Sequence, residues 1–325
     1  MNSTRYGKFF VGIFLLIAAT AAFRWVLLRC VPYTYMDDEY PWWMQTKDYI
    51  QTKGERQEVL LMGDSRMKSG VLPSKLCENA YNIAVGGATP LEMYYSLKAY
   101  LQAHPKPERI IMGFGGFHYS SEEAFKTRCL YFHFLPLWEE LESQLRGYRL
   151  GLFDFGKLRD EVTDTLKYEL LFPQKYSAAC INGKFKREEY NRLQYQNTVE
   201  TRGHMFFGRN AESDAGLNGE AYSNAFVVNP RINYYLRRII DLCKELDIPL
   251  YIEQLPMNEP SWQKINGSGY YAEFQSYFST LAEETGIPVE TEIPCYEPEF
   301  FGDPSHLNPR GAARFTAEIK AKYSL

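Results

Sequence analysis

The segment VLLMGDSRMKSG, residues 59–70, decides how the rest of the chain is arranged. It opens with a continuous apolar run, Val59–Met62, of the kind that a strand buried on both faces requires. Gly63 ends the run, and Ser65 follows where a helix is expected to begin. Ligands of parallel α/β sheets gather at the carboxyl ends of the strands. The segment therefore predicts a central strand that presents Ser65 to a ligand crevice.

Strands and helices are expected to alternate beyond this segment. Buried apolar runs predict further strands at residues 81–85, 109–114 and 248–255. Apolar residues at helical spacing, often behind a capping residue and a proline, predict helices at 90–103, 230–246 and 309–322. This order predicts an α/β fold with a doubly wound parallel sheet covered by helices.

Three other parts complete the expected domain organisation. A membrane anchor at residues 1–30 is followed by a linker at 31–55 rich in Trp and Tyr. The α/β domain then occupies residues 56–325. Residues 119–226 show no clear alternation of strands and helices, so we expect a largely helical insertion over the edge of the sheet there.

The N-terminal segment FFVGIFLLIAATAAFRWVLL, residues 9–28, has the length and composition of a membrane-spanning helix. About 20 residues give roughly 30 Å of helix, which matches a bilayer core. Arg24 is its single charged residue, and lies near its end beside Trp25, where both side chains suit the interface. A cleaved signal peptide is the alternative, favoured by the small residues at 18–22 and opposed by the length of the apolar stretch.

The charges flanking this segment give little information on its orientation. Arg5 and Lys8 precede it, while Arg24 and Arg29 lie at its far end. A single N-terminal anchor with all other residues beyond it favours a cytoplasmic N-terminus and an extracytoplasmic domain.

Composition excludes several classes of function. A net charge of −4 with scattered Lys and Arg gives no basic footprint for nucleic acid. No clustered metal-ligand spacing and no glycine-rich nucleotide loop is present, so no metal or cofactor is expected. The six cysteines are widely spaced without a CxxC pair, and buried free thiols are the preferred interpretation: Cys30, Cys77, Cys129, Cys180, Cys243 and Cys295.

A second motif, GDPSHLNPRGA at residues 302–312, supplies the partners that Ser65 needs. A serine hydroxyl is a weak nucleophile without a base, and His306 is the best candidate for that base. Asp303 is placed to hold the other ring nitrogen of His306 and to stabilise the imidazolium. The helix that follows Ser65 would add backbone N–H groups and a positive dipole for an oxyanion. Acyl transfer is therefore the leading hypothesis.

Together these motifs resemble the SGNH (GDSL-type) hydrolase superfamily. The resemblance rests on GDS at 63–65, NIAVGGAT at 82–89 and DPSH at 303–306, and covers most of residues 56–118 and 229–325. It implies a flavodoxin-like sheet, with Ser65 as nucleophile, His306 as base and Asp303 as its orienting acid. It also implies that the Gly86–Gly87 turn lines the oxyanion hole, with Gly87 as a backbone donor.

One block departs from the family pattern. The family usually carries Gly-x-Asn-Asp after the third strand, and this chain has GFGGFHYS at 113–120, with Phe117 near the expected asparagine. His118, Tyr119 or a backbone N–H is then left to replace the asparagine donor, and His118 has either that role or a structural one. Anchored members of the superfamily that act on cell-envelope polymers also depart at this block.

Two functions remain open on this evidence. The first is a membrane-anchored serine esterase or O-acyltransferase that acts on acyl esters, acetyl esters in particular, of a cell-envelope glycan. The second is a non-catalytic factor of the same fold that binds such a glycan or a multi-spanning membrane acyltransferase.

Overall fold

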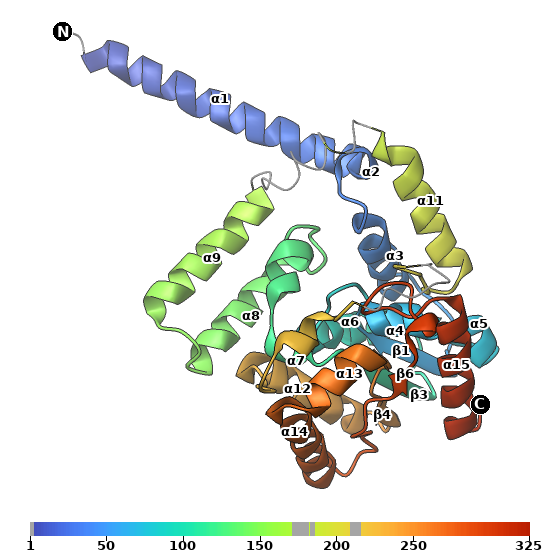
Figure 1. Ribbon diagram of the computed structural model, residues 1–325. Helices are drawn as coiled ribbons and strands as arrows, with labels where there is room; N and C mark the ends of the chain where they lie inside the picture. The colour runs from blue at the N-terminus through green and yellow to red at the C-terminus, as the bar shows by residue number, and fades with distance from the viewer. Residues whose placement is uncertain (1–2, 171–181, 183–185, 209–215) are drawn as a thin grey trace. The chain divides into compact units, whose positions relative to one another are not determined.

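The computed structural model describes residues 3–170, 182, 186–208 and 216–325 (Figure 1). The chain divides into two compact units, which are described separately. One consists of Met1–Pro41 and Leu130–Gln194, and the other of Trp42–Cys129 and Tyr195–Leu325.

A parallel sheet forms the centre of the unit that contains Ser65. Its strands are β1 (Val59–Gly63), β2 (Ala80–Asn82), β3 (Arg109–Gly113) and β4 (Leu250–Ile252), in the order β2-β1-β3-β4. Every residue of β1 is buried, as expected for a central strand covered on both faces. All four predicted strands are confirmed, although β2 and β4 are shorter than expected.

Helices α6 (Pro90–Ala103) and α12 (Pro230–Glu245) pack against each other, and α6 also contacts β1. Thr89 and Glu92 form a capping box that begins α6, and Asn229 caps α12 through two backbone N–H groups. Each helix has proline in its first turn, where the missing N–H is not needed. Both helices therefore begin at the predicted residues.

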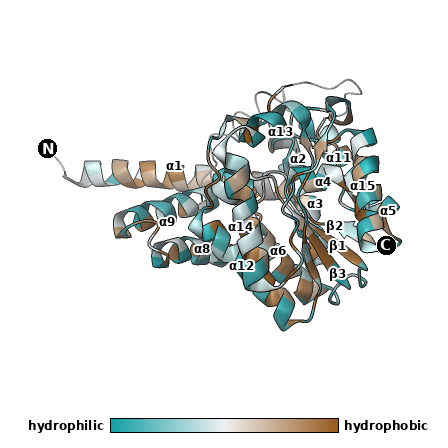
Figure 2. Ribbon diagram, turned by 60° about the horizontal axis from the view of Figure 1, so that its bottom comes forward, coloured by the Kyte–Doolittle hydropathy of each residue, from teal (hydrophilic) through white to brown (hydrophobic). Residues whose placement is uncertain are grey.

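Helix α15 (Pro309–Tyr323) packs against both α4 (Ser65–Gly70) and α5 (Pro73–Leu76). Their buried apolar side chains share one core cluster with Val59, Leu61 and Ile111 of the sheet. Because side chains alternate along a strand, the residues between these point to the opposite face. Figure 2 shows the brown, apolar strands β1 and β3 between α6 and α12 on one side and α4 and α15 on the other.

Shorter elements complete this unit. They are α7 (Phe117–Ser120), the π-helical turn η1 (Phe125–Leu130), the 3-10 turn η2 (Gly219–Tyr222), β5 (Met257–Asn258), α13 (Glu259–Asn266), α14 (Gly269–Thr285), β6 (Cys295–Tyr296) and the 3-10 turn η3 (Pro298–Phe300). Strands β5 and β6 form a separate two-stranded parallel sheet.

The described part of the other unit is helical. It contains α1 (Ser3–Cys30), α2 (Pro32–Tyr35), α8 (Leu137–Arg149), α9 (Phe155–Leu170) and most of α11 (Arg187–Glu200). Within α1, the 22 residues Tyr6–Leu27 have a mean hydropathy of 2.1 and are long and apolar enough to cross a membrane.

Three expectations need correction or restriction. The expected linker at residues 31–55 contains α2 and α3 (Tyr40–Gln51), and its Trp43 is fully buried. Residues 119–129 and 195–226 of the expected insertion belong to the unit that contains the sheet. Of the five described cysteines, all free thiols, Cys30 and Cys295 are exposed rather than buried, and Cys180 lies outside the described residues.

Candidate active site

Ser65 is the first residue of α4 and directly follows the turn that ends β1. Gly63 has a φ of +151°, and a Cβ there would lie 1.9 Å from the carbonyl oxygen of Gly113, so only glycine lets β1 and β3 end this close together. The fully buried Asp64 caps α4 and accepts a 2.8 Å hydrogen bond from the N–H of Arg66. The half-buried Ser65 is therefore held at the carboxyl end of the sheet, as predicted.

The Asp303–His306 loop is tied down at both ends. Phe301 and Leu307 form an antiparallel bridge that closes the loop. Asn308 caps α15 with its side-chain oxygen and donates from Nδ2 to the carbonyl of Phe301 at 3.2 Å. A further amide, that of the fully buried Asn258, donates to the carbonyl of Pro304 at 2.7 Å. Few conformations are left to the loop.

Ser65, His306 and Asp303 form a continuous chain of hydrogen bonds. His306 Nε2 lies 2.8 Å from Ser65 Oγ, and His306 Nδ1 lies 2.8 Å from Asp303 Oδ2. A carboxylate only accepts, so Nδ1 carries the proton and Nε2 is left to accept from the serine hydroxyl. The chain of hydrogen bonds thus joins Ser65 to His306 and Asp303, which lie 241 and 238 positions later in the sequence.

The environment of Asp303 favours its ionised form. Burial opposes ionisation, but the hydrogen bond and charge of His306 outweigh it. The backbone N–H groups of Ser305 and His306 also donate to Asp303 Oδ1, each at 2.8 Å. As a result, the pKa of Asp303 lies below its ordinary value, and the carboxylate is available to stabilise an imidazolium.

The segment after α11 contacts the imidazole of His306, and no sequence motif predicted this contact. The Phe207 ring stacks on His306, with 4.7 Å between centroids and 24° between planes, and Trp42 meets Phe207 edge-on at 5.1 Å. A Cβ on Gly208 would lie 2.5 Å from the carbonyl carbon of Gly302, so the two backbones are in close contact. Phe207 lies inside the expected insertion and Trp42 inside the expected linker, and no sequence motif at either position indicated this role.

The expected oxyanion turn follows β2. Gly86 is buried, and Gly87 is half-buried with a φ of +76°. Within the part of the chain that the structure describes, the N–H groups of both glycines donate to no protein acceptor. Lys68 Nζ donates to the carbonyl of Ala84 at 2.9 Å, and Asn82 donates to a backbone carbonyl of α4 at 3.0 Å. Two side-chain contacts therefore hold the strand that leads into this turn against the helix that begins with Ser65.

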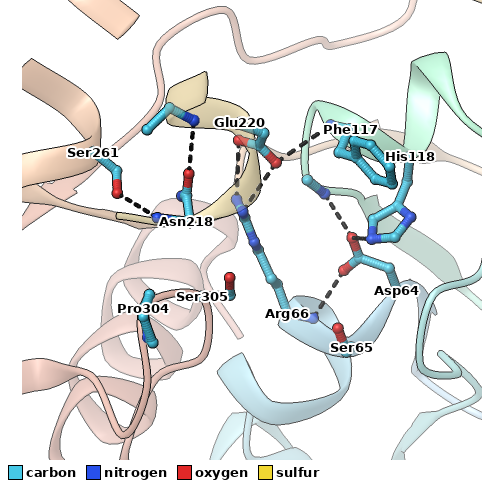
Figure 3. Close-up of polar contacts among 12 residues, drawn as sticks. Asp64, Ser65, Arg66, Phe117, His118, Asn218, Glu220, Ser261, Pro304 and Ser305 are labelled. Carbon is cyan, nitrogen blue, oxygen red and sulfur yellow. Dashed lines mark hydrogen bonds and ion pairs between the residues drawn. The ribbon is translucent and has the colours of Figure 1, made fainter. Parts of the chain in front are cut away.

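The block with Phe117 is held by two buried carboxylates (Figure 3). Asp64 Oδ2 accepts from the N–H of Gly115 at 2.7 Å and lies 3.3 Å from His118 Nε2. Glu220 Oε1 accepts from the N–H of Phe117 at 3.3 Å. Phe117 itself is 40% exposed. Two candidates to replace the asparagine donor thus already have partners. His118 contacts Asp64, the residue before Ser65, and the N–H of Phe117 donates to Glu220.

Arg66 pairs with Glu220 through its two terminal guanidinium nitrogens, at 2.9 and 3.3 Å (Figure 3). The side chains are 10% and 2% exposed, so this is a buried bidentate pair. Its partner lies 154 residues away, which no local pattern could have revealed. Burial lowers the pKa of His118, and the positive charge of Arg66 acts in the same direction, while Asp64 opposes it.

Lys68 is a second cation that the sequence did not single out. It is fully buried one helical turn after Ser65, and burial lowers its pKa to about 7. Its backbone carbonyl accepts from Nδ1 of the buried His204 at 3.2 Å and from the N–H of Met205 at 3.3 Å. Lys68 therefore connects three segments: α4, the residues between β2 and Gly86, and the segment that carries Phe207.

Comparison with protein-family models and with curated proteins finds no match to this chain.

Proposed function

We propose that this chain is a membrane-anchored serine esterase or O-acyltransferase of the SGNH type. The observation that supports this most is the unbroken hydrogen-bonded sequence Ser65 Oγ, His306 Nε2, His306 Nδ1 and Asp303 Oδ2. The strand order β2-β1-β3-β4 agrees with a flavodoxin-like sheet, and Val289 adds a parallel bridge beyond β4 where a fifth strand would stand.

In the first half of the proposed reaction, Ser65 Oγ attacks the carbonyl carbon of an acyl ester. The hydroxyl proton moves to His306 Nε2, and Asp303 stabilises the imidazolium that forms. The tetrahedral intermediate collapses, the C–O bond to the leaving alcohol breaks, and His306 returns the proton to that alcohol. An acyl-serine remains on the chain.

The oxyanion is assigned to backbone donors in this proposal. The N–H of Gly87 is the first, because no protein acceptor occupies it among the described residues. The amino end of α4, which begins at Ser65, adds a positive dipole. Losing one oxyanion donor typically costs about 10²–10³ in rate. We therefore expect slower turnover than from an enzyme with an additional side-chain amide.

In the second half, an acceptor hydroxyl attacks the acyl-serine, and His306 again takes and returns one proton. Water as acceptor gives an esterase, and a glycan hydroxyl gives an O-acyltransferase. The apolar stretch Tyr6–Leu27 would keep the site at a membrane surface, which favours an envelope glycan over a soluble metabolite.

Turnover of a chromogenic acetyl ester by the full-length protein in detergent tests the proposal. We expect wild type to release acetate, and Ser65→Ala and His306→Ala to lose about 10³-fold or more in kcat. Addition of an oligosaccharide then separates the two reactions, since acetylated oligosaccharide identifies a transferase and free acetate alone identifies an esterase.

Equal release of acetate by wild type and Ser65→Ala would contradict the proposal. Absence of turnover by wild type, with an intact fold, would instead favour a non-catalytic factor that binds a glycan or a membrane acyltransferase.

A further inference from the structure

Helix α8 (Leu137–Arg149) has its polarity inverted. Its buried residues are Glu139, Glu140, Ser143, Gln144 and Gly147. By contrast, Trp138 is 59% exposed, and Leu145 and Tyr148 are 38% and 39% exposed. A helix on a water-soluble domain shows the opposite pattern, with its apolar stripe turned inwards.

The exposed apolar residues of α8 form one continuous stripe. Trp138, Leu141, Leu145 and Tyr148 follow one another at spacings of three, four and three residues, which places them on a single helix face. Leu141 is half-buried and the other three are exposed. The stripe is therefore a surface of α8 and not a set of scattered side chains.

Helix α9 (Phe155–Leu170), which packs against α8, repeats the inversion. Its buried residues include Glu161 and Thr165. Four of its apolar residues also lie at spacings of three, four and four: Phe155, Leu158, Val162 and Leu166. Of these, Phe155 is 70% exposed and Leu166 is 38% exposed. Both helices thus bury polar side chains and expose large apolar ones, and α9 also exposes charged side chains such as Arg159 and Lys167.

The turn between the two helices combines apolar and basic residues. Leu150 is 39% exposed. Arg146 and Arg149 precede the turn, whereas Lys157 and Arg159 behind it are ion-paired with Glu161 at 3.1 Å and with Asp160 at 2.9 Å. Apolar side chains exposed along a helix are the pattern of segments that lie in the interface of a bilayer.

We propose that the α8–α9 hairpin is a second membrane-contacting element, which inserts its exposed apolar side chains into the interface of a lipid bilayer. Three observations select lipid as the occupant. Large apolar side chains are exposed on both helices, polar side chains are buried in both, and the same compact unit carries the apolar helix α1. A chain anchored by α1 keeps the hairpin at a high local concentration near lipid. The proposal does not depend on the chemistry of Ser65.

Photo-crosslinking of the full-length protein reconstituted in lipid vesicles tests the proposal. The vesicles used in this test consist of phosphatidylcholine. Phe155 and Trp138 are replaced singly by p-benzoylphenylalanine, and lipid adducts are measured by intact mass after illumination. Trp25 in α1 is the positive control. Tyr222 in η2 is the matched negative control, because Tyr222 and Phe155 are both 70% exposed aromatic residues.

We expect lipid adducts at Phe155 and Trp138 within about threefold of the yield at Trp25, and at least tenfold above Tyr222. Yields at both hairpin positions equal to that at Tyr222 would overturn the proposal. Crosslinks to another polypeptide in native membranes, without lipid adducts, would also overturn it. Thermal melts identify any variant that fails to fold. If one hairpin variant fails, the adduct yield at the other hairpin position tests the proposal.

Discussion

The imidazole of His306 is fixed at three places: Asp303 holds Nδ1, Ser65 contacts Nε2, and Phe207 stacks on the ring face. Such fixing matters because a general base must keep one tautomer and one orientation to take the serine proton. The two carboxylate oxygens of Asp303 lie 3.0 and 2.8 Å from Nδ1. The orienting role of Asp303 can therefore be tested separately from the presence of the base.

Replacement of Asp303 by Asn should lower kcat for an acetyl ester by about 10²–10⁴, with a small effect on KM. The amide can donate to Nδ1, which would favour the tautomer with the proton on Nε2 and leave no acceptor for Ser65. Steady-state kinetics measure both constants. Glu299→Gln, a loss of one charge at an exposed position near the loop, is the control. Equal kcat in Asp303→Asn and the control would contradict the role of Asp303.

Lys68 predicts a specific dependence of stability on pH. Its pKa is about 7 in the folded chain and about 10.5 when unfolded, so the unfolded state binds more protons between these values. The stabilities of wild type and Lys68→Met should therefore diverge, with wild type gaining about 1–2 kcal/mol relative to the variant from pH 7 to pH 8.5.

Urea unfolding of both proteins at the two pH values measures this difference. The exposed Lys264→Met serves as the control. Parallel pH profiles for wild type and Lys68→Met would show that Lys68 does not titrate in this range.

At the scale of elements, the β1–α4 turn is the point where four segments meet. Asp64 caps α4 and holds the Gly115–His118 block, while Arg66 reaches η2 through Glu220. Because the Arg66–Glu220 pair is nearly fully buried, removing one partner leaves an uncompensated charge away from water. The pair is thus a stringent test of whether the site is assembled as described.

Glu220→Gln should destabilise the fold by about 3–5 kcal/mol, and the added change Arg66→Met should recover part of this loss. Urea unfolding of the single and double variants measures the coupling. Glu299→Gln, which breaks the exposed pair with Arg310, should leave the midpoint nearly unchanged. Purely additive effects at Arg66 and Glu220 would contradict a buried pair.

Gly208 offers a test of how closely its segment contacts the Asp303–His306 loop. A Cβ there would lie 2.5 Å from the carbonyl carbon of Gly302 and 3.0 Å from the backbone nitrogen of Asp303. Gly208→Ala should therefore displace the loop, and we expect a loss of at least tenfold in kcat. Gly219→Ala, where a Cβ meets nothing within 4 Å, is the matched control. Equal activity of the two variants would contradict the contact.

The elements with local signals were predicted from the sequence with accurate bounds. Proline and capping residues mark the starts of α6, α12 and α15, and the continuous apolar run marks β1. Ser65, His306 and Asp303 were found through short motifs, and the structure brings all three together. The parts that sequence reasoning missed depend on distant contacts, such as Glu220 on Arg66 and Phe207 on His306. Neither partner carries a local pattern that indicates its role.

At the scale of the whole molecule, the apolar helix α1 and the sheet unit belong to separate compact parts of the chain. The 22-residue stretch Tyr6–Leu27 satisfies the length of a bilayer span, and the small residues near its end leave a cleaved signal peptide as the competing interpretation. A retained membrane span and a cleaved signal peptide predict different masses for the mature protein.

We expect the mature protein to keep its N-terminal segment and to remain in the membrane fraction after alkaline carbonate extraction. Intact mass spectrometry and immunoblotting of the extracted membranes measure both properties. Release into the supernatant with a mass reduced by about 20–30 residues would establish a cleaved signal and remove the membrane from the proposed function.

The central claim is that Ser65 is an activated nucleophile. The most direct measurement is the reaction of the full-length protein with a fluorophosphonate, followed by peptide mapping of the adduct. We predict a single stoichiometric adduct on Ser65, lost in Ser65→Ala and slowed about 10³-fold or more in His306→Ala. An unlabelled Ser65 in a correctly folded protein, or an adduct that survives Ser65→Ala, would contradict the claim.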